Sequence, residues 1–106
     1  ERLGPAICYE VVFPDEVTEL TRAGATVLVS MTNDAWYGDT AAPWQHLRAA
    51  RFRAAENRRW LLRAAITGVS AVIAPDGSIS AKTTGAVTYE WLTREIESAL
   101  RDGNVD

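Results

Sequence analysis

Ala25-Thr26-Val27-Leu28-Val29-Ser30 is a short run rich in β-branched residues, and such a run predicts a β-strand. Before it, residues 14–24 open with Pro14, which a first helical turn accepts, and carry apolar residues at helical spacing up to Gly24. Residues 3–9 form another apolar run without alternation, as expected for a strand buried on both faces. Strand, helix and strand over this length predict a βαβ unit with parallel strands, and therefore an α/β fold.

A long helix and a β-hairpin are expected after this unit. Residues 43–59 are rich in strong helix formers. Residues 60–67 and 69–74 resemble strands, and Pro75-Asp76-Gly77 is a tight-turn signal that leads into a further short strand at residues 78–81. These two features extend the α/β pattern as far as residue 81.

The main portion covers residues 1–87, and the tail covers residues 88–106 with the pattern of an acidic amphipathic helix. The tail departs from the character of the preceding sequence. A total of 106 residues with 47% hydrophobic and 24% charged side chains is typical of one globular domain or part of one. No apolar stretch approaches the roughly 20 residues that a membrane-spanning helix needs. The net charge of −3 argues against general nucleic-acid binding.

Cys8 is the only cysteine, so it forms no internal disulfide and no thiolate zinc cage. It lies at the carboxyl end of the first predicted strand, where open α/β sheets place their sites, and nearby backbone N–H groups would stabilise a thiolate. The alternative is a buried, unreactive cysteine, which composition alone favours. Glu10 would project to the same side of an extended chain, where it could orient the site or transfer a proton. Its alternative role is helix capping or a salt bridge.

Three further features have two interpretations each. His46 could pair with the cysteine as in cysteine proteases, but a histidine early in a helix is more often a capping or buried hydrogen-bonding residue. Trp36 and Tyr37 lie in a turn-rich segment, either as a packed plug or at the entrance of a site. The six arginines between Arg48 and Arg63 could bind an anion, but we expect them to pair with carboxylates on other segments of a larger domain.

Several blocks of sequence together resemble the carbon–nitrogen hydrolase (nitrilase) superfamily, and within it an N-acyltransferase branch. The resemblance covers residues 4–85. The blocks are Ile7-Cys8-Tyr9-Glu10 with Phe13-Pro14, Ser30-Met31-Thr32-Asn33-Asp34-Ala35-Trp36-Tyr37-Gly38, Pro43-Trp44-Gln45-His46, Arg51-Phe52-Arg53-Ala54-Ala55-Glu56, and Thr67-Gly68-Val69-Ser70-Ala71-Val72-Ile73.

The resemblance implies part of an α-β-β-α sandwich with a Glu-Lys-Cys triad. Cys8 would be the nucleophile, Tyr9 an oxyanion-binding backbone donor and Glu10 a required neighbouring carboxylate. The general-base glutamate and the lysine would lie upstream of this chain, because Lys82 follows the hairpin turn and matches neither. We therefore expect the chain to be the inactive C-terminal portion of a catalytic domain.

The implied reaction moves an acyl chain from a phospholipid, through a cysteine thioester, to the N-terminal amine of a diacylglyceryl apolipoprotein. Trp36, Tyr37 and Gly38 would bind substrate at the site entrance. The implied location is the outer, periplasmic face of the bacterial inner membrane, reached through upstream membrane helices, with no nucleic acid, cofactor or metal. The alternatives are an amidase of the same superfamily acting on a small carboxamide, and a catalytically silent truncated module.

Overall fold

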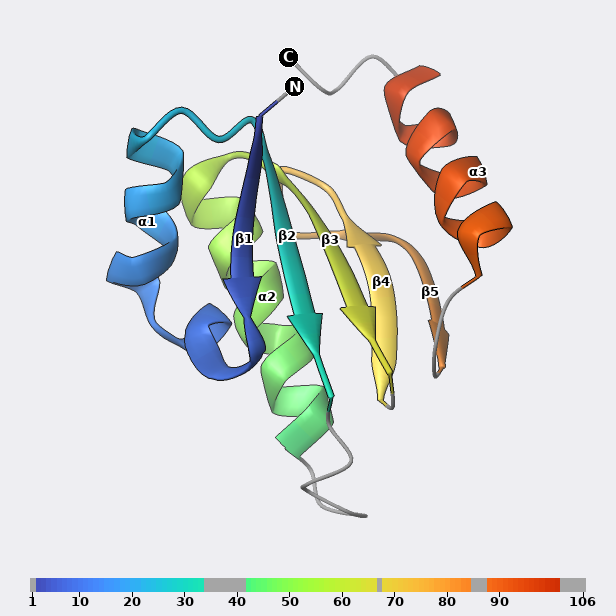
Figure 1. Cartoon of the computed structure of the whole chain (residues 1–106), viewed down its shortest axis with the longest axis horizontal. Helices are drawn as coiled ribbons and strands as arrows, with labels where there is room; N and C mark the ends of the chain where they lie inside the picture. The colour runs from blue at the N-terminus through green and yellow to red at the C-terminus, as the bar shows by residue number, and fades with distance from the viewer. Residues whose placement is uncertain (1, 34–41, 67, 85–87, 102–106) are drawn as a thin grey trace.

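The computed structural model describes residues 2–33, 42–66, 68–84 and 88–101. At Cys8 and Tyr9 the description is confined to the backbone. Five strands, three α-helices and one 3₁₀-helix follow one another along the described residues (Figure 1). Their order is β1 (Leu3–Ile7), η1 (Cys8–Val12), α1 (Pro14–Arg22), β2 (Val27–Thr32), α2 (Ala42–Asn57), β3 (Trp60–Ala65), β4 (Val69–Ile73), β5 (Ile79–Thr84) and α3 (Tyr89–Arg101).

The predicted βαβ unit is confirmed. β1 and β2 are parallel neighbours, with Leu3 opposite Val27 and Ile7 opposite Met31. The connecting helix α1 begins with Pro14 in its first turn, where a missing N–H costs nothing because no intrahelical carbonyl is available. Acidic residues in the first turn and a basic residue in the last suit the helix dipole. Local sequence therefore determines both ends of α1.

All five strands form one mixed sheet in the order β1-β2-β3-β4-β5. β3 is parallel to β2. β4 is antiparallel to β3, and β5 is antiparallel to β4. The predicted hairpin turn is present, since the N–H of Gly77 donates to the carbonyl of Ala74 at 2.8 Å and the N–H of Ala74 donates to Ser78 at 2.8 Å. β5 is longer than expected and extends to Thr84.

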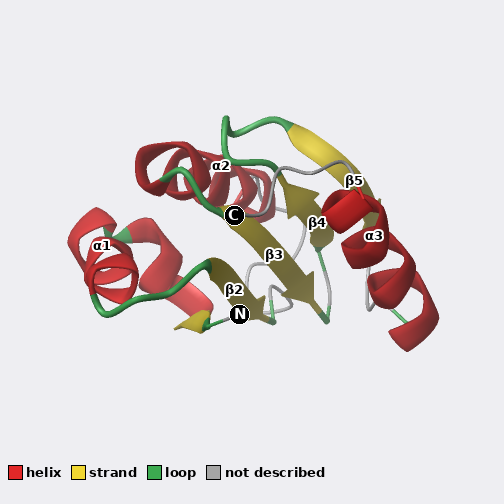
Figure 2. Cartoon of the chain, turned by 90° about the horizontal axis from the view of Figure 1, so that it is seen from above, coloured by secondary structure: helices red, strands yellow, loops and turns green. Residues whose placement is uncertain are grey.

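The three helices divide between the two faces of the sheet (Figure 2). α1 and α2 cover one face, and the main core between them and the sheet includes Val11, Leu28, Leu61 and Ile73, each at most 1% exposed. α3 lies against the other face beside β4 and β5, where Trp91 packs on a smaller cluster that contains Trp60 and Val72. The amphipathic tail thus docks as a helix.

The remainder of that second face, over β1 and β2, is apolar and solvent-exposed. Register places Leu3, Ile7 and Met31 on it, and they are 66%, 49% and 42% exposed. Exposed apolar patches of this kind are typical of interaction surfaces. No helix in the described part of the chain is long and apolar enough to cross a membrane.

Gly77 is a position where a side chain should be costly. Its φ of +89° lies in the left-handed region, and an added Cβ would approach the carbonyl oxygen of Arg51 to 3.1 Å and the Cβ of Ala55 to 3.3 Å. We expect Gly77→Ala to lower the free energy of unfolding by about 1–3 kcal/mol in urea titration, because both the backbone and the neighbouring helix must adjust. Ser80→Ala, at an exposed position of β5, is the control and should change it by less than about 0.5 kcal/mol. Equal stability of the Gly77 variant would contradict this prediction.

Candidate functional site

The candidate site lies at the sheet edge where the three parallel strands end. Ile7, Met31 and Ala64 align across β1, β2 and β3, so the residues that follow them meet at one edge (Figure 1). The backbone of Cys8 comes directly after Ile7, and Asn33 directly follows β2. The prediction that Cys8 follows the carboxyl end of a parallel strand is therefore confirmed. Trp36, Tyr37 and Gly38 lie outside the described residues.

The nucleophile candidate stands on a 3₁₀-helix, which the sequence did not predict. β1 ends at Ile7 instead of continuing to Tyr9, and η1 occupies Cys8–Val12. A 3₁₀-helix completes a turn in three residues, so the backbone from Cys8 to Glu10 is not extended. The extended chain from which we expected Cys8 and Glu10 to project to one side is therefore absent. Cys8 and Tyr9 take the first two helical positions, whose N–H groups have no intrahelical acceptor.

Glu10 caps this short helix. Its Oε1 accepts a hydrogen bond from the backbone N–H of Ile7 at 2.6 Å, and its backbone carbonyl accepts one from the N–H of Phe13 at 3.1 Å. The carboxylate therefore folds back toward the end of β1 and bridges the residue before the cysteine to the residue two after it. This contact is the helix-capping role that the sequence left open, and it gives the carboxylate a direct influence on the geometry of the turn.

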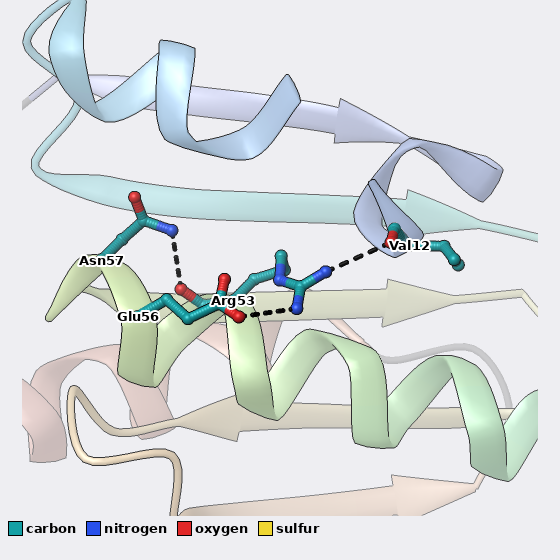
Figure 3. Close-up of polar contacts among 4 residues, drawn as sticks. All are labelled: Val12, Arg53, Glu56 and Asn57. Atoms are coloured by element: carbon teal, nitrogen blue, oxygen red, sulfur yellow. Dashed lines mark hydrogen bonds and ion pairs between the residues drawn. The ribbon is translucent and has the colours of Figure 1, made fainter. Parts of the chain in front are cut away.

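Arg53 contacts the far end of the same turn (Figure 3). Its Nη1 donates to the carbonyl oxygen of Val12 at 3.2 Å, and its Nη2 donates to Oε1 of Glu56 at 2.8 Å. The Arg53 side chain is 9% exposed, and the Glu56 carboxylate is 44% exposed. One buried guanidinium therefore ties α2 to the last residue of η1. Sequence reasoning included this residue in a motif but gave it no role of its own.

Arginines in the stretch from Arg48 to Arg63 bind mainly backbone carbonyl oxygens of this chain. Besides Arg53, three Nε atoms do so at 2.8, 3.1 and 3.0 Å, namely those of Arg51 to Gly77, Arg59 to Ala25 and Arg63 to Val69. Arg53 and Glu56 form an ion pair within this stretch, at 2.8 Å. The carboxylate partners that we expected belong to other segments of a larger domain, so their pairing with these side chains stays a prediction. The arginines join the helices, strands and turns of this domain to each other.

Small polar residues are buried within the sheet near the same edge. Ser30 and Ser70 are 0% exposed, and Thr32 is 6% exposed. The Ser70 hydroxyl oxygen accepts from the N–H of Ala65 at 3.0 Å, and the carbonyl of Thr32 accepts from the N–H of Ile66 at 3.0 Å. These residues were not predicted, although alternating Leu28, Ser30 and Thr32 in an apolar strand was an available signal. They connect β2, β3 and β4 where the strands end.

His46 is 5% exposed and lies near the start of α2, in agreement with a buried histidine. A catalytic pair of His46 and the Cys8 thiol stays a prediction, because the structure describes only the backbone of Cys8. Lys82 lies on β5 with its Nζ 6.0 Å from the ring centroid of Trp44. Among the described residues, no three histidine, cysteine, aspartate or glutamate side chains gather as metal ligands.

A cleft of about 420 Å³ lies between α2 and the β4–β5 turn, at the opposite edge of the sheet from Cys8. Asp76 lines it, and the hydroxyl and N–H of Ser78 hold the pKa of that carboxyl below its usual range by donating to it at 2.6 and 2.9 Å. Arg48 and Arg51 line the other side. The ionised carboxylate of Asp76 shares the cleft with these cations, so the cleft is poorly suited to bind an anion. The cleft also lies far from the cysteine.

Comparison with known proteins gives a consistent result. The sequence profile of the carbon–nitrogen hydrolase family matches residues 2–102. A protein named apolipoprotein N-acyltransferase from Brucella suis is 50% identical over 76 residues, which are 72% of this chain and 14% of that protein. One of the same name from Wigglesworthia glossinidia brevipalpis is 38% identical over 96 residues, 91% of this chain and 19% of that protein. The chain thus spans less than a fifth of the length of these relatives.

A solved structure supports the same fold. It is a mutant of the amidase from Nesterenkonia sp. AN1 with the acetamide moiety of fluoroacetamide added covalently at its active-site cysteine. It superposes with a TM-score of 0.62 at 26% identity, covering 79% of this chain and 34% of that chain. The five-stranded sheet with its helices is therefore a portion of a nitrilase-like fold, as the sequence predicted.

Proposed function

Because the chain belongs to the carbon–nitrogen hydrolase family, we propose that it is the later part of the catalytic domain of an apolipoprotein N-acyltransferase. The observation that carries this proposal is the 50% identity to a protein of that name over most of the chain. The amidase structure is 26% identical, so the small-carboxamide alternative has weaker support. The position of the Cys8 backbone at the carboxyl edge of the parallel strands fits nucleophilic chemistry in either case.

In the proposed reaction the Cys8 thiolate attacks the carbonyl carbon of a phospholipid acyl ester. The ester C–O bond breaks, the lysophospholipid alkoxide leaves with a proton, and the acyl chain remains on sulfur as a thioester. The N-terminal amine of a diacylglyceryl apolipoprotein then attacks the thioester, loses a proton and releases the thiolate. The general-base glutamate and the lysine of the family belong to sequence upstream of these residues. The chain alone should therefore form no thioester.

Two residues beside the nucleophile would shape this step. The backbone N–H of Tyr9 is proposed to bind the oxyanion of the tetrahedral intermediate, since it occupies a helical position without an intrahelical acceptor. Glu10 is proposed to orient the turn, and its hydrogen bond from Ile7 supports this role over direct proton transfer. Trp36, Tyr37 and Gly38 remain the proposed substrate contacts at the entrance, in the segment that follows β2.

The exposed half of the sheet fits a domain of which this chain is one layer. Leu3, Ile7 and Met31 lie on the face that a second sheet would cover in an α-β-β-α sandwich. We propose that the upstream half of the domain packs there and brings the remaining triad residues to Cys8. The proposed setting is the outer, periplasmic face of the bacterial inner membrane, with upstream membrane helices as the attachment.

The test is a search for an acyl adduct on Cys8. Full-length protein is incubated with phosphatidylethanolamine, and the peptide that carries Cys8 is analysed by mass spectrometry. We expect a mass increase equal to one acyl chain, sensitive to hydroxylamine, and no increase in the Cys8→Ala variant. Absence of the adduct in folded protein that turns over a small carboxamide would support the amidase instead, and absence of both activities would support a catalytically silent module.

A further inference from the structure

We propose that Arg53 is a positioning residue that holds the Cys8 turn in its reactive geometry from α2. The inference deepens the proposed function and rests on it for the role of Cys8. It depends on contacts to backbone atoms of the turn, and these can be tested without any acyl chemistry.

The guanidinium of Arg53 bonds two groups from a buried position. Nη1 donates to the Val12 carbonyl at 3.2 Å and Nη2 donates to Glu56 at 2.8 Å, as Figure 3 shows. The Arg53 side chain is 9% exposed. A buried charge requires both a counter-charge and hydrogen-bond acceptors, and these two groups supply one of each. The guanidinium is therefore fixed in place by the same contacts through which it fixes the turn.

Val12 is the last residue of η1, and the final carbonyls of a helix lack intrahelical donors. Arg53 satisfies one of them. At the other end of the turn, Glu10 accepts the N–H of Ile7. Between these ends, Val11 is 0% exposed and belongs to the core beneath the sheet. The five residues that begin with Cys8 are thus held by a carboxylate at the start, a core side chain in the middle and a guanidinium at the end.

This attachment matters because the position of a nucleophile must be accurate. A displacement of about 1 Å can cost on the order of 10²-fold in rate. The planar guanidinium reaches two acceptors in different directions at once, whereas the single ammonium of lysine does so poorly. The geometry therefore assigns arginine a specific role here, and α2 transmits its position to the residue that carries the reaction.

The first test is hydrogen–deuterium exchange of the 106-residue chain, with Arg51→Met as the control for Arg53→Met. Both arginines lie on α2 and donate to a backbone carbonyl, but Arg51 bonds Gly77 in the β4–β5 turn at 2.8 Å. We expect Arg53→Met to accelerate exchange of the amides at residues 8–13 by about tenfold or more, as loss of a charged hydrogen bond implies. Arg51→Met should accelerate exchange near Gly77 and leave residues 8–13 at the wild-type rate.

The second test measures the acylation step in full-length protein. Arg53→Met should slow formation of the Cys8 acyl adduct by about tenfold or more while the phospholipid concentration at half-maximal rate stays within about twofold, since the donor site is not altered. Arg53→Lys should lie between wild type and Arg53→Met. A substitution that only weakened the fold would instead accelerate amide exchange in the β4–β5 turn near Gly77 and also slow adduct formation.

The outcomes separate the two proposals. Faster exchange at residues 8–13 with no adduct in the wild type would reject the acyltransferase and keep the attachment of the turn to Arg53. Wild-type exchange at residues 8–13 in both Arg53 variants would overturn the positioning role, whatever the adduct experiment gives. If Arg53→Met does not fold, Arg53→Lys decides the question, because its exchange at residues 8–13 must still exceed that of Arg51→Met.

Discussion

Arg63→Ala should lower the free energy of unfolding by about 3 kcal/mol or more, because it removes a buried hydrogen-bond donor and leaves a cavity in the sheet. The residue is 2% exposed, and its Nε donates to the carbonyl of Val69 at 3.0 Å. This contact joins β3 to the start of β4. Since domains are stable by only about 5–15 kcal/mol, the loss would be a large share of the total.

Two other variants show which part of the Arg63 effect is due to the donor. Arg63→Met keeps most of the volume and loses the donors, so it should cost less than Arg63→Ala, about 1–2 kcal/mol. Arg22→Ala removes an arginine whose ion pair to Glu19 is solvent-exposed, and it should cost less than about 1 kcal/mol. Urea titration followed by circular dichroism measures all three. If Arg63→Ala and Arg22→Ala were equally stable, the buried arginine would make no net contribution to the fold.

The arrangement of the sheet was predictable because its strands carry strong local signals. β2 is a β-branched run, α1 has a proline at its start, and the turn at Asp76 and Gly77 has the residues that a tight turn needs. These features act within a few residues of the chain. Periodicity and turn chemistry therefore predicted the order of the strands and α-helices from β1 to the hairpin. The amphipathic pattern of the tail likewise predicted a helix, which packs on the sheet through Trp91.

The polar interactions were less predictable because their acceptors are backbone atoms distant in sequence. Arg53 bonds Val12, 41 positions away, and Arg59 bonds Ala25, 34 positions away. A carbonyl carries no side-chain signature, so composition suggested carboxylate partners outside the chain. The 3₁₀-helix was missed because the apolar run over residues 3–9 favours a strand locally, whereas β1 ends at Ile7 and η1 begins at Cys8.

Glu10→Ala in the full-length protein should slow acylation of Cys8 by on the order of 10²-fold, whereas Glu10→Gln should retain the rate within about tenfold. The structural reason is the 2.6 Å hydrogen bond in which Glu10 Oε1 accepts the N–H of Ile7, the residue that precedes the nucleophile. Alanine removes the acceptor and frees the start of η1. Glutamine keeps a carbonyl oxygen at the same place and can accept the same N–H, although more weakly because it is uncharged.

This pair of variants distinguishes the two roles that the sequence left open for Glu10. If the residue orients the turn, the acceptor oxygen is what matters and glutamine substitutes for glutamate. If it transfers a proton, the loss of acid–base chemistry makes glutamine as defective as alanine, with a fall of about 10²–10⁴-fold. Glu16→Ala is the control, since Glu16 lines a small hollow together with Glu10 and is exposed in the first turn of α1. Its rate should equal the wild type, because lowering the negative charge near the turn does not by itself displace the cysteine.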